Sequence, residues 1–370
     1  MKSRRVRLSD IAELTVGFVG NMAKQYKDEG VKFLRSLNIK PFSIVEDDLK
    51  YISREFNESL RKSILHENDL IIVRTGIPGT CCVVSKDYEG CNCADVVLVR
   101  PNLQVVNPHY LAAYINVWGK KQVENNKVGA IQKHFNVKSA EEMLIDLPDL
   151  ESQNKVAKIL CDLNDKIISN DKINDYLLQK MKTIFSFHFL QNAHNEWKRV
   201  SLATLTEMYQ PKTISGKELD RNGKYFVYGA NGVIGKYNRY NHCDSEIAVA
   251  CRGASCGSVQ MTLPFSWITG NAMIIKPSAN FPYREYIYYY LLSKSPDYLC
   301  SGSAQPQLTR DNLSLYTIVV PSKHQLENFE ENAKIIRTLM IKNQMENIEL
   351  STLRDWLLPM LMNGQATIED

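Results

Sequence analysis

The most regular stretch of the chain, residues 151–190, repeats apolar side chains every three to four residues. Five seam positions fall seven residues apart: Val156, Leu163, Asn170, Leu177 and Ile184. Further apolar residues stand between them: Ile159, Leu160, Ile167, Ile173 and Met181. Neither Gly nor Pro interrupts the stretch, so the spacing predicts one long helix that buries a narrow seam.

The same pattern returns near the C-terminus, over residues 324–363. Its seam positions are Phe329, Ile336, Asn343, Leu350 and Leu357, with Ala333, Leu339, Met340, Leu353 and Leu361 between them. Each seam position lies 173 residues after its counterpart, as from Val156 to Phe329. The shared offset favours a mutual coiled coil in which Asn170 faces Asn343, a buried pair that lowers stability but sets the register. The alternative is two ordinary amphipathic helices, each docked on its own domain.

The rest of the chain is duplicated as well. A short apolar strand runs into an Arg and a Gly-punctuated turn at NDLIIVRTGIPGT and again at SEIAVACRGASCGS. The strand DVVLVRP returns as NAMIIKP, and MLIDLP, which precedes the first long helix, returns as YTIVVP. The order predicts two α/β domains at residues 1–150 and 192–322, each followed by a helical region, at 151–191 and 323–370. Gly364 is placed to cap the second helix.

Composition describes an ordinary globular protein, with 44% hydrophobic and 23% charged residues among 370. The net charge is only +4, so a nucleic-acid contact would need a concentrated basic face. The nine cysteines are irregularly spaced, and the N-terminus carries no apolar signal region. These features predict free thiols and a cytoplasmic location. The apolar runs are strand-sized, and none predicts a membrane span.

The search for catalytic motifs finds no convincing site. Asn107-Pro108-His109-Tyr110 lacks the second Pro of the adenine-methyltransferase loop, and it reads as the start of a helix. The stretch 229–237 is Gly-rich but fails the phosphate-loop pattern, so a turn between two strands is expected. The Cys and His spacings do not match zinc sites. We therefore predict no catalytic residues, no metal and no cofactor for this chain.

Binding residues are expected in the turns where the repeats match. Arg and Gln suit bidentate contacts with guanine and adenine edges, and Lys suits phosphates. The candidates in the first domain are Arg74, Thr75, Lys120, Lys121, Lys127, Gln132, Lys133, His134 and Lys138. Those in the second domain are Lys236, Arg239, Arg252, Gly253, Gln305, Gln307 and Arg310. The strand and turn patterns of the two domains match, while their loop sequences differ. The two domains are therefore expected to read two different half-sites on double-stranded DNA.

The arrangement resembles the specificity subunit of type I restriction–modification systems over nearly the whole chain. The resemblance rests on the duplicated heptads, the junctions PDLESQ at Pro148 and PSKHQ at Pro321, and the ending LLPMLMNG. It implies an antiparallel coiled coil and two target-recognition domains related by a pseudo-twofold axis. It also implies an asymmetric bipartite DNA site and a complex with two methyltransferase subunits, joined by restriction subunits for cleavage.

The resemblance places S-adenosylmethionine, ATP and magnesium on the partner subunits, so this chain would not be an enzyme. Two other functions stay open from the residues alone: a stand-alone methyltransferase or nuclease, and a coiled-coil scaffold that does not bind DNA. Apolar residues outside the seam need a cover, which is either the chain's own domains or, by preference, the methyltransferase partners. They are Phe185, Phe187, Phe189, Trp356 and Met360.

Overall fold

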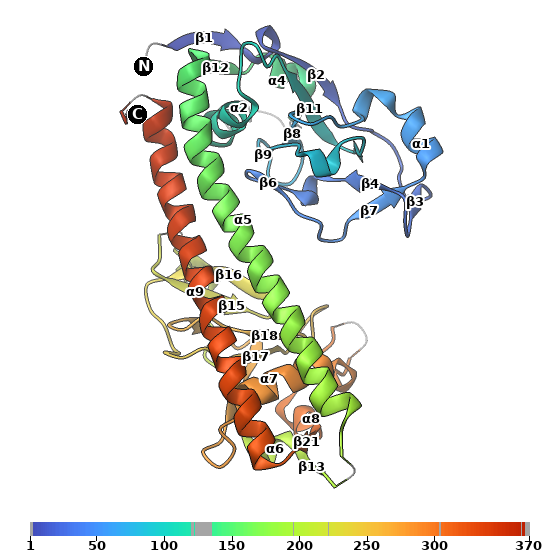
Figure 1. The fold of residues 1–370 in the computed structure, drawn as a ribbon, viewed down its shortest axis with the longest axis vertical. Helices are drawn as coiled ribbons and strands as arrows, with labels where there is room; N and C mark the ends of the chain where they lie inside the picture. The colour runs from blue at the N-terminus through green and yellow to red at the C-terminus, as the bar shows by residue number, and fades with distance from the viewer. Residues whose placement is uncertain are drawn as a thin grey trace. The chain divides into compact units, whose positions relative to one another are not determined.

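The computed structural model describes residues 3–119, 122, 135–194, 196–220, 222–302, 305–363 and 365–366. Contacts divide the chain into two compact units (Figure 1). Unit 1 comprises Met1–Ser169 and Glu346–Asp370, and unit 2 comprises Asn170–Met345. The two long helices are α5, Leu150–Ser186, and α9, Lys323–Met362, close to the predicted bounds. Each unit therefore contains one strand-rich domain and one half of each long helix.

Unit 1 opens with a strand that pairs with the strand before α5. Its strands are β1 Ser3–Arg7, β2 Ala12–Val16, β3 Tyr26–Lys27, β4 Val31–Leu34, β5 Ile39–Lys40, β6 Ser43–Ile44, β7 Lys50–Ile52, β8 Leu70–Val73, β9 Cys81–Val83, β10 Asn92–Cys93, β11 Val96–Pro101 and β12 Leu144–Pro148. Its short helices are α1 Arg54–Ser59, α2 Pro108–Tyr114, continued by a π turn at Ile115–Gly119, and α4 Val137–Glu141. The sheets have the orders β1-β12, β2-β11-β8-β9, β10-β4-β7-β3 and β5-β6.

Unit 2 begins within α5, which continues into a π turn at Phe187–Gln191. Its strands are β13 Lys198–Ser201, β14 Thr206–Tyr209, β15 Tyr225–Gly229, β16 Gly232–Tyr237, β17 Ile247–Ala250, β18 Val259–Met261, β19 Trp267–Ile268, β20 Ala272–Pro277 and β21 Thr317–Val320. Its short helices are α6 Leu202–Leu205, α7 Arg284–Ser293 and α8 Arg310–Ser314. The sheets have the orders β13-β21, β14-β20-β17-β18 and β16-β15-β19.

The predicted duplication is confirmed by the strand order. The main sheet of unit 1, β2-β11-β8-β9, and that of unit 2, β14-β20-β17-β18, are built from the matching repeats in the same order. In both units the opening strand pairs antiparallel with the closing strand. The second sheet differs in strand number and order, so the two units share a frame but not the surface built on it.

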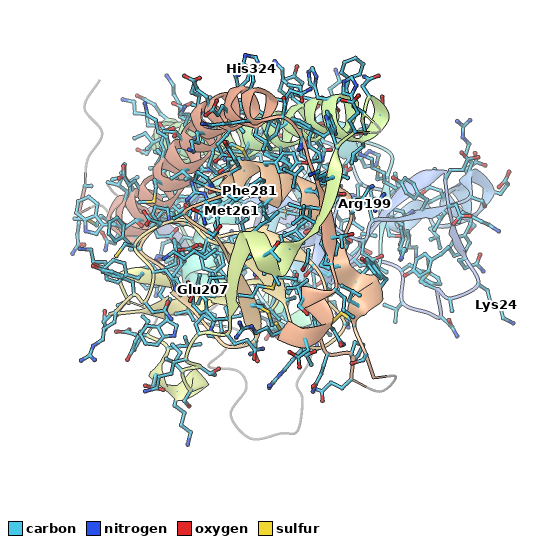
Figure 2. The ribbon with its side chains drawn as sticks, turned by 90° about the horizontal axis from the view of Figure 1, so that it is seen from below. Lys24, Arg199, Glu207, Met261, Phe281 and His324 are labelled. Carbon is cyan, nitrogen blue, oxygen red and sulfur yellow. A yellow bond between two sulfur atoms is a disulfide. The ribbon has the colours of Figure 1, made fainter. Side chains whose placement is uncertain are left out.

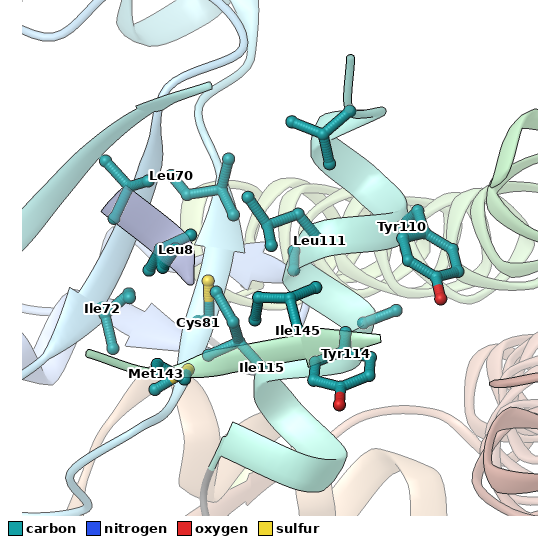
Figure 3. Packing of buried hydrophobic residues seen from close by; sticks show 14 of the residues in the cluster. Leu8, Leu70, Ile72, Cys81, Tyr110, Leu111, Tyr114, Ile115, Met143 and Ile145 are labelled. Atoms are coloured by element: carbon teal, nitrogen blue, oxygen red, sulfur yellow. The ribbon is translucent and has the colours of Figure 1, made fainter. Parts of the chain in front are cut away.

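The core of unit 1 forms between the main sheet, α2 and the adjoining ends of α5 and α9. The strand β8 is buried along its whole length, and Leu111 and Ile115 pack against it (Figure 3). The first turns of α5 and the last turns of α9 belong to the same cluster, through Val156 and Leu361. In unit 1, therefore, the beginning of α5 lies against the end of α9.

The core of unit 2 gathers aromatic rings. Phe185 is fully buried, with its ring 5.5 Å from those of Phe329 and Tyr286. Phe281 lies in the interior and the half-buried Met261 packs against the same cluster, whereas His324 is exposed on the outer side of α9 (Figure 2). The end of α5 thus packs against the beginning of α9, and the antiparallel direction is confirmed in each unit. The preference for partner subunits as the cover of Phe185 and Phe189 was wrong, because the chain's own domain covers both rings.

The predicted seam is buried or half-buried at all ten positions: Val156, Leu163, Asn170, Leu177, Ile184, Phe329, Ile336, Asn343, Leu350 and Leu357. For three of the apolar residues between these positions, the expected burial was wrong. Ile173, Leu339 and Leu353 are more than 40% exposed, at 45%, 44% and 42%. They fall beside the seam because a straight α-helix turns 100° per residue, so only part of each apolar face meets the partner helix.

The predicted pairing of Asn170 with Asn343 needs correction. Asn343 donates from Nδ2 to Oδ1 of Asn174 at 2.9 Å, one turn further along α5, and Asn170 is also buried. A helical side chain leans toward the N-terminus of its own helix. In an antiparallel pair, Asn343 therefore reaches past position 170 toward the next turn.

Asparagine amides also bind the main chain of the opposite helix. In unit 2, Asn174 donates from Nδ2 to the carbonyl oxygen of Met340 at 3.0 Å. In unit 1, Asn347 donates from Nδ2 to the carbonyl oxygen of Ile167 at 3.3 Å. The offset of 173 residues converts Asn174 into Asn347 and Ile167 into Met340. The same contact therefore recurs in both units, at positions that the seven-residue spacing did not single out.

The domains are attached to the long helices by different side chains. In unit 1, the buried Gln153 accepts a hydrogen bond from the backbone N–H of Asn107 at 2.9 Å and donates to the carbonyl oxygen of Pro148. The matching junction of unit 2 offers only Gln325, which binds the nearby Ser322. The two junctions of the sequence are thus similar in spacing but not in contact.

Unit 2 uses buried charges for the attachment instead. Glu330 of α9 accepts from the backbone N–H groups of Glu285 and Tyr286 at the start of α7, at 2.9 and 3.2 Å. Arg337 donates from Nε and a terminal nitrogen to Glu285 at 3.2 Å and lies 4.6 Å from the ring of Tyr288. Burial raises the pKa of the Glu330 carboxyl. Removal of one member of such a buried pair costs about 3–5 kcal/mol.

Two segments that resemble catalytic motifs form a helix cap and a hairpin. Asn107 caps α2, and its Oδ1 accepts from the backbone N–H groups of His109 and Tyr110. The Gly-rich stretch 229–237 forms the β15–β16 hairpin. Both are the structural roles predicted for these segments. Gly364 lies outside the described residues. Across the described ranges, no helix is long and apolar enough to cross a membrane.

Replacing Asn174 by Ala should lower the free energy of unfolding of unit 2 by about 1–3 kcal/mol, since the buried amide of Asn343 loses its acceptor. Urea denaturation followed by circular dichroism measures the change. The control is Asn328→Ala, an exposed position of α9 in the same unit, which should stay within about 0.5 kcal/mol of the parent. Equal stability of the two variants would contradict the role of the amide contact.

Candidate functional site

In each unit, the turn after a central strand lies beside the loop that precedes a short helix. In unit 2, β17 runs into Arg252 and Gly253, and the backbone N–H of Gly253 donates to the carbonyl oxygen of Pro306 at 3.1 Å. A second hydrogen bond between the same segments runs from the backbone N–H of Leu308 to the carbonyl oxygen of Cys251 at 2.9 Å. Arg252 and Gln307 face each other as an isolated β-bridge. Two of the segments predicted to bind are thus brought together.

Glycine is required where the two segments approach most closely. Gly257 has a φ of +86°, and an added Cβ would lie 2.4 Å from the Cα of Asp297. Only a residue without a side chain adopts this conformation and leaves room for the neighbouring chain. The turn 253–257 is therefore held against residues 295–302 and 305–308 by backbone contacts.

The side chains on this paired surface point to solvent. Arg252, Gln305, Gln307 and Arg310 are all exposed, and Arg310 is the first residue of α8, whose N-cap is Thr309. Guanidinium and amide groups presented in this way can form bidentate hydrogen bonds with planar partners. The second unit thus presents a compact polar surface built from two loops far apart in sequence.

In the matching turn of unit 1, the side chains bind other groups of the same domain. Arg74 donates from Nε to the carbonyl oxygen of Phe135 at 3.2 Å and forms an ion pair with Asp95 at 3.1 Å. Thr75 donates from Oγ1 to the second carboxylate oxygen of Asp95 at 3.1 Å. The Arg74 side chain is only 17% exposed. The turn thus lies next to Phe135, just before α4, and the arginine is held within the domain.

Asp95 was not singled out from the sequence. It directly precedes β11, in the place where Asn271 precedes β20 in the second repeat. A comparison of the two repeats at this position, an acid in one and an amide in the other, is the signal that could have revealed it. The difference makes Arg74 part of an ion pair in one unit and leaves Arg252 exposed in the other.

The remaining candidates are distributed over other elements. Lys138 is exposed on α4, and Arg239 is exposed after β16. Lys236 on β16 lies over the ring of Phe226 at 5.5 Å, in a sheet separate from that of β17. Six candidates lie outside the described residues and stay predictions: Lys120, Lys121, Lys127, Gln132, Lys133 and His134.

A family model described as the type I restriction modification DNA specificity domain matches residues 2–179 and again residues 194–353. The chain belongs to this family. Each match takes one α/β domain together with most of the long helix that follows it, which is the repeat unit seen in the sequence.

Relatives of this specificity family align along nearly the whole chain. A Methanocaldococcus jannaschii protein, provisionally named type I restriction enzyme MjaX specificity subunit, is 22% identical over 98% of this chain and 93% of its own length. The MjaVIII specificity subunit of the same organism is 19% identical over 90% of each protein. The crystal structure of the type I restriction-modification S subunit from M. genitalium superposes with a TM-score of 0.56 and 16% identity, over 97% and 96% of the two chains. This likeness shows a shared fold.

The prediction that all cysteines are free thiols was wrong for one pair. Cys256 and Cys300 form a disulfide. Their side chains meet only because the turn 253–257 folds onto the loop after residue 295, which the spacing in sequence does not reveal. Seven cysteines are unpaired, and five of them are buried. Within the described residues, no group of three or more His, Cys, Asp or Glu side chains is placed to hold a metal ion.

Replacing Gly257 by Ala should destabilise the paired loops, because the new Cβ meets Asp297 and the positive φ becomes strained, at a cost of about 1–3 kcal/mol. Thermal denaturation and limited proteolysis of residues 295–308 report the effect. Gly216→Ala is the matched control in the same unit, since its added Cβ meets nothing within 4 Å. Unchanged protease resistance in Gly257→Ala would show that the close approach is not required.

Proposed function

We propose that this chain is the DNA-recognition subunit of a type I restriction–modification complex and that each domain reads one half of an asymmetric bipartite site. The family membership supports the role in DNA specificity. Double-stranded DNA is the expected partner because exposed Arg and Gln side chains match the base edges of the major groove.

The observation that carries the proposal is the paired surface of unit 2. Arg252 and Gln307 come from loops 55 positions apart in sequence, yet they stand opposite each other and are both exposed. Gln305 and Arg310 extend the same surface. Two guanidinium and two amide groups can contact successive bases and the adjoining phosphates.

The two half-sites are expected to differ. Asp95 engages Arg74 in unit 1, whereas Arg252 in unit 2 is presented to solvent. The second sheets also differ in strand order. A common frame with different loop chemistry suits two unlike sequences better than a palindrome.

Catalysis is assigned to other subunits of the complex. We place S-adenosylmethionine, ATP and magnesium on the partners, which are two methyltransferase subunits, joined by restriction subunits for cleavage. The chain itself acts as a non-catalytic specificity subunit that binds DNA and holds these partners. The motifs searched in the sequence support this division, since none of them fits a catalytic site.

A shallow groove on α9 is a candidate for contact with a methyltransferase subunit. Ile348, Thr352, Leu353 and Trp356 line it, and Trp356 is 60% exposed. Phe187, in the π turn that follows α5, is 53% exposed. Adjacent exposed apolar side chains, such as Leu353 and Trp356, are typical of surfaces that a partner covers.

The double variant Arg252→Ala with Gln307→Ala should relax recognition of one half-site only. Each lost bidentate contact costs about 1–3 kcal/mol in discrimination, so the methylated motif should lose sequence information in one half and keep the other. Methylated bases are mapped in DNA from cells that express the variant with its partner subunits. Arg199→Ala, an exposed arginine on β13, is the charge-matched control. Equal loss in both halves would contradict the assignment of one half-site to each domain.

Replacing Phe187 and Trp356 by Ala together should reduce co-purification with the methyltransferase subunit, since the apolar area that the partner covers is removed. Affinity capture from co-expressing cells, followed by quantitative mass spectrometry, gives the ratio of the two subunits. The control is Tyr298→Ala, an aromatic residue that is 68% exposed in the second domain. An unchanged ratio in the double variant would exclude these side chains from the interface.

A further inference from the structure

The disulfide of unit 2 lies within the paired loops. Cys256 and Cys300 are 44 residues apart in sequence, with Cα atoms 6.4 Å apart. Both residues are partly exposed, so small thiols and disulfides can reach them. The buried cysteines, such as Cys81 and Cys82, lack this access, and burial raises the pKa of both thiols.

Each cysteine is anchored in one of the two loops. The backbone N–H of Cys256 donates to the carbonyl oxygen of Gly253 at 3.0 Å, within the turn that follows Arg252. On the other side, Ser301, the neighbour of Cys300, exchanges two backbone hydrogen bonds of 2.8 Å with Gln307. The sulfur–sulfur bond therefore joins the segment that presents Arg252 to the segment that presents Gln307.

Besides the disulfide, the two loops are joined by hydrogen bonds and by the packing of the buried Leu308 in the core of unit 2. The Ser295 hydroxyl donates to the carbonyl oxygen of Gly257 at 3.2 Å, and Gly253 donates to Pro306 at 3.1 Å. Leu308 anchors one end of the loop pair in the core, whereas the bonds of Gly253 and Ser295 lie nearer to solvent, so this outer part opens more easily when the cross-link is absent. The disulfide is the covalent element of this loop pair.

The first domain has no counterpart of this bond. In its sequence Pro78 precedes Gly79 where Cys256 precedes Gly257, and the offset of 173 residues places Lys127 opposite Cys300. A change in the state of the cysteine pair therefore acts on one domain alone. In the proposed function, this means one half-site.

We propose that Cys256 and Cys300 form a redox modification site that controls how firmly the second domain holds its DNA-reading loops. The inference rests on the proposed function of the loops. With the bond present, Arg252 and Gln307 stay in the arrangement described above. With two thiols in its place, the loops sample more conformations and pay an ordering cost when they bind.

The chemistry is thiol–disulfide exchange with a small disulfide such as oxidised glutathione. One protein thiolate attacks the small disulfide, which releases one molecule of the small thiol and leaves a mixed disulfide. The second protein thiolate displaces the remaining small thiol. Two protein protons and two electrons are thereby transferred, so one small disulfide becomes two small thiols. An excess of a reducing thiol reverses both steps.

The test uses the full chain co-purified with its methyltransferase partner, treated with oxidised glutathione or with dithiothreitol. Alkylation and peptide mass spectrometry show whether the two cysteines are joined. Binding is measured to three duplexes: the complete site, and the site with one or the other half scrambled. Oxidised protein should bind the complete site about tenfold more tightly than reduced protein, a modest part of what closing a loop of this length can supply. The gain should disappear when the half read by the second domain is scrambled.

Variants separate this effect from general oxidation. Cys256→Ser and Cys300→Ser should bind like reduced protein in both treatments, while Cys243→Ser, which removes an exposed unpaired thiol of the same unit, should keep the response. Three results would overturn the proposal: no bond under oxidised glutathione, equal binding by oxidised and reduced protein, or an equal response in Cys256→Ser. Failure of every form to bind the complete site would instead refute the proposed function.

Discussion

The antiparallel contact of α5 with α9 depends on asparagine amides that reach the opposite main chain. Asn174 binds the carbonyl oxygen of Met340 in unit 2, and Asn347 binds that of Ile167 in unit 1. A carbonyl already used within a helix keeps a second lone pair, so it can accept this additional bond. A slip of one residue would turn the buried amide of Asn174 away from its acceptor, at about 1–3 kcal/mol. Apolar seam residues stabilise the pair, whereas the amides specify its register.

Each half of the helix pair serves as a platform for one domain, and the attachments have diverged. Unit 1 uses the neutral Gln153, which satisfies backbone groups at the start of α2 and at the end of β12. Unit 2 uses Glu330, Glu285 and Arg337, a charged cluster in the interior. A buried charged cluster tolerates the loss of one member poorly. The duplicated frame therefore does not make the two units equivalent in how they respond to substitution.

The same divergence reaches the surface proposed to read DNA. Both units bring the turn after a central strand next to residues that shortly precede a short helix, because the strand order of the main sheet is shared. In unit 1 the turn is neutralised by Asp95, while in unit 2 the arginine is exposed and the loops are joined by Cys256 and Cys300. One architecture can thus carry two specificities, since the frame places the loops and the loop residues determine the contacts.

Sequence alone determined the features that depend on local periodicity. The heptads and the offset of 173 residues predicted both long helices to within a residue at their starts, and the repeated strand and turn patterns predicted the duplicated domains. Only the tertiary structure decided that Asn343 meets Asn174, that Asp95 engages Arg74, and that Cys256 bonds to Cys300. Periodicity records which face of an element is buried, because burial acts on every turn in the same way. Contacts between residues far apart in the chain depend on how whole elements pack and on where each side chain leans, and no local pattern contains that information.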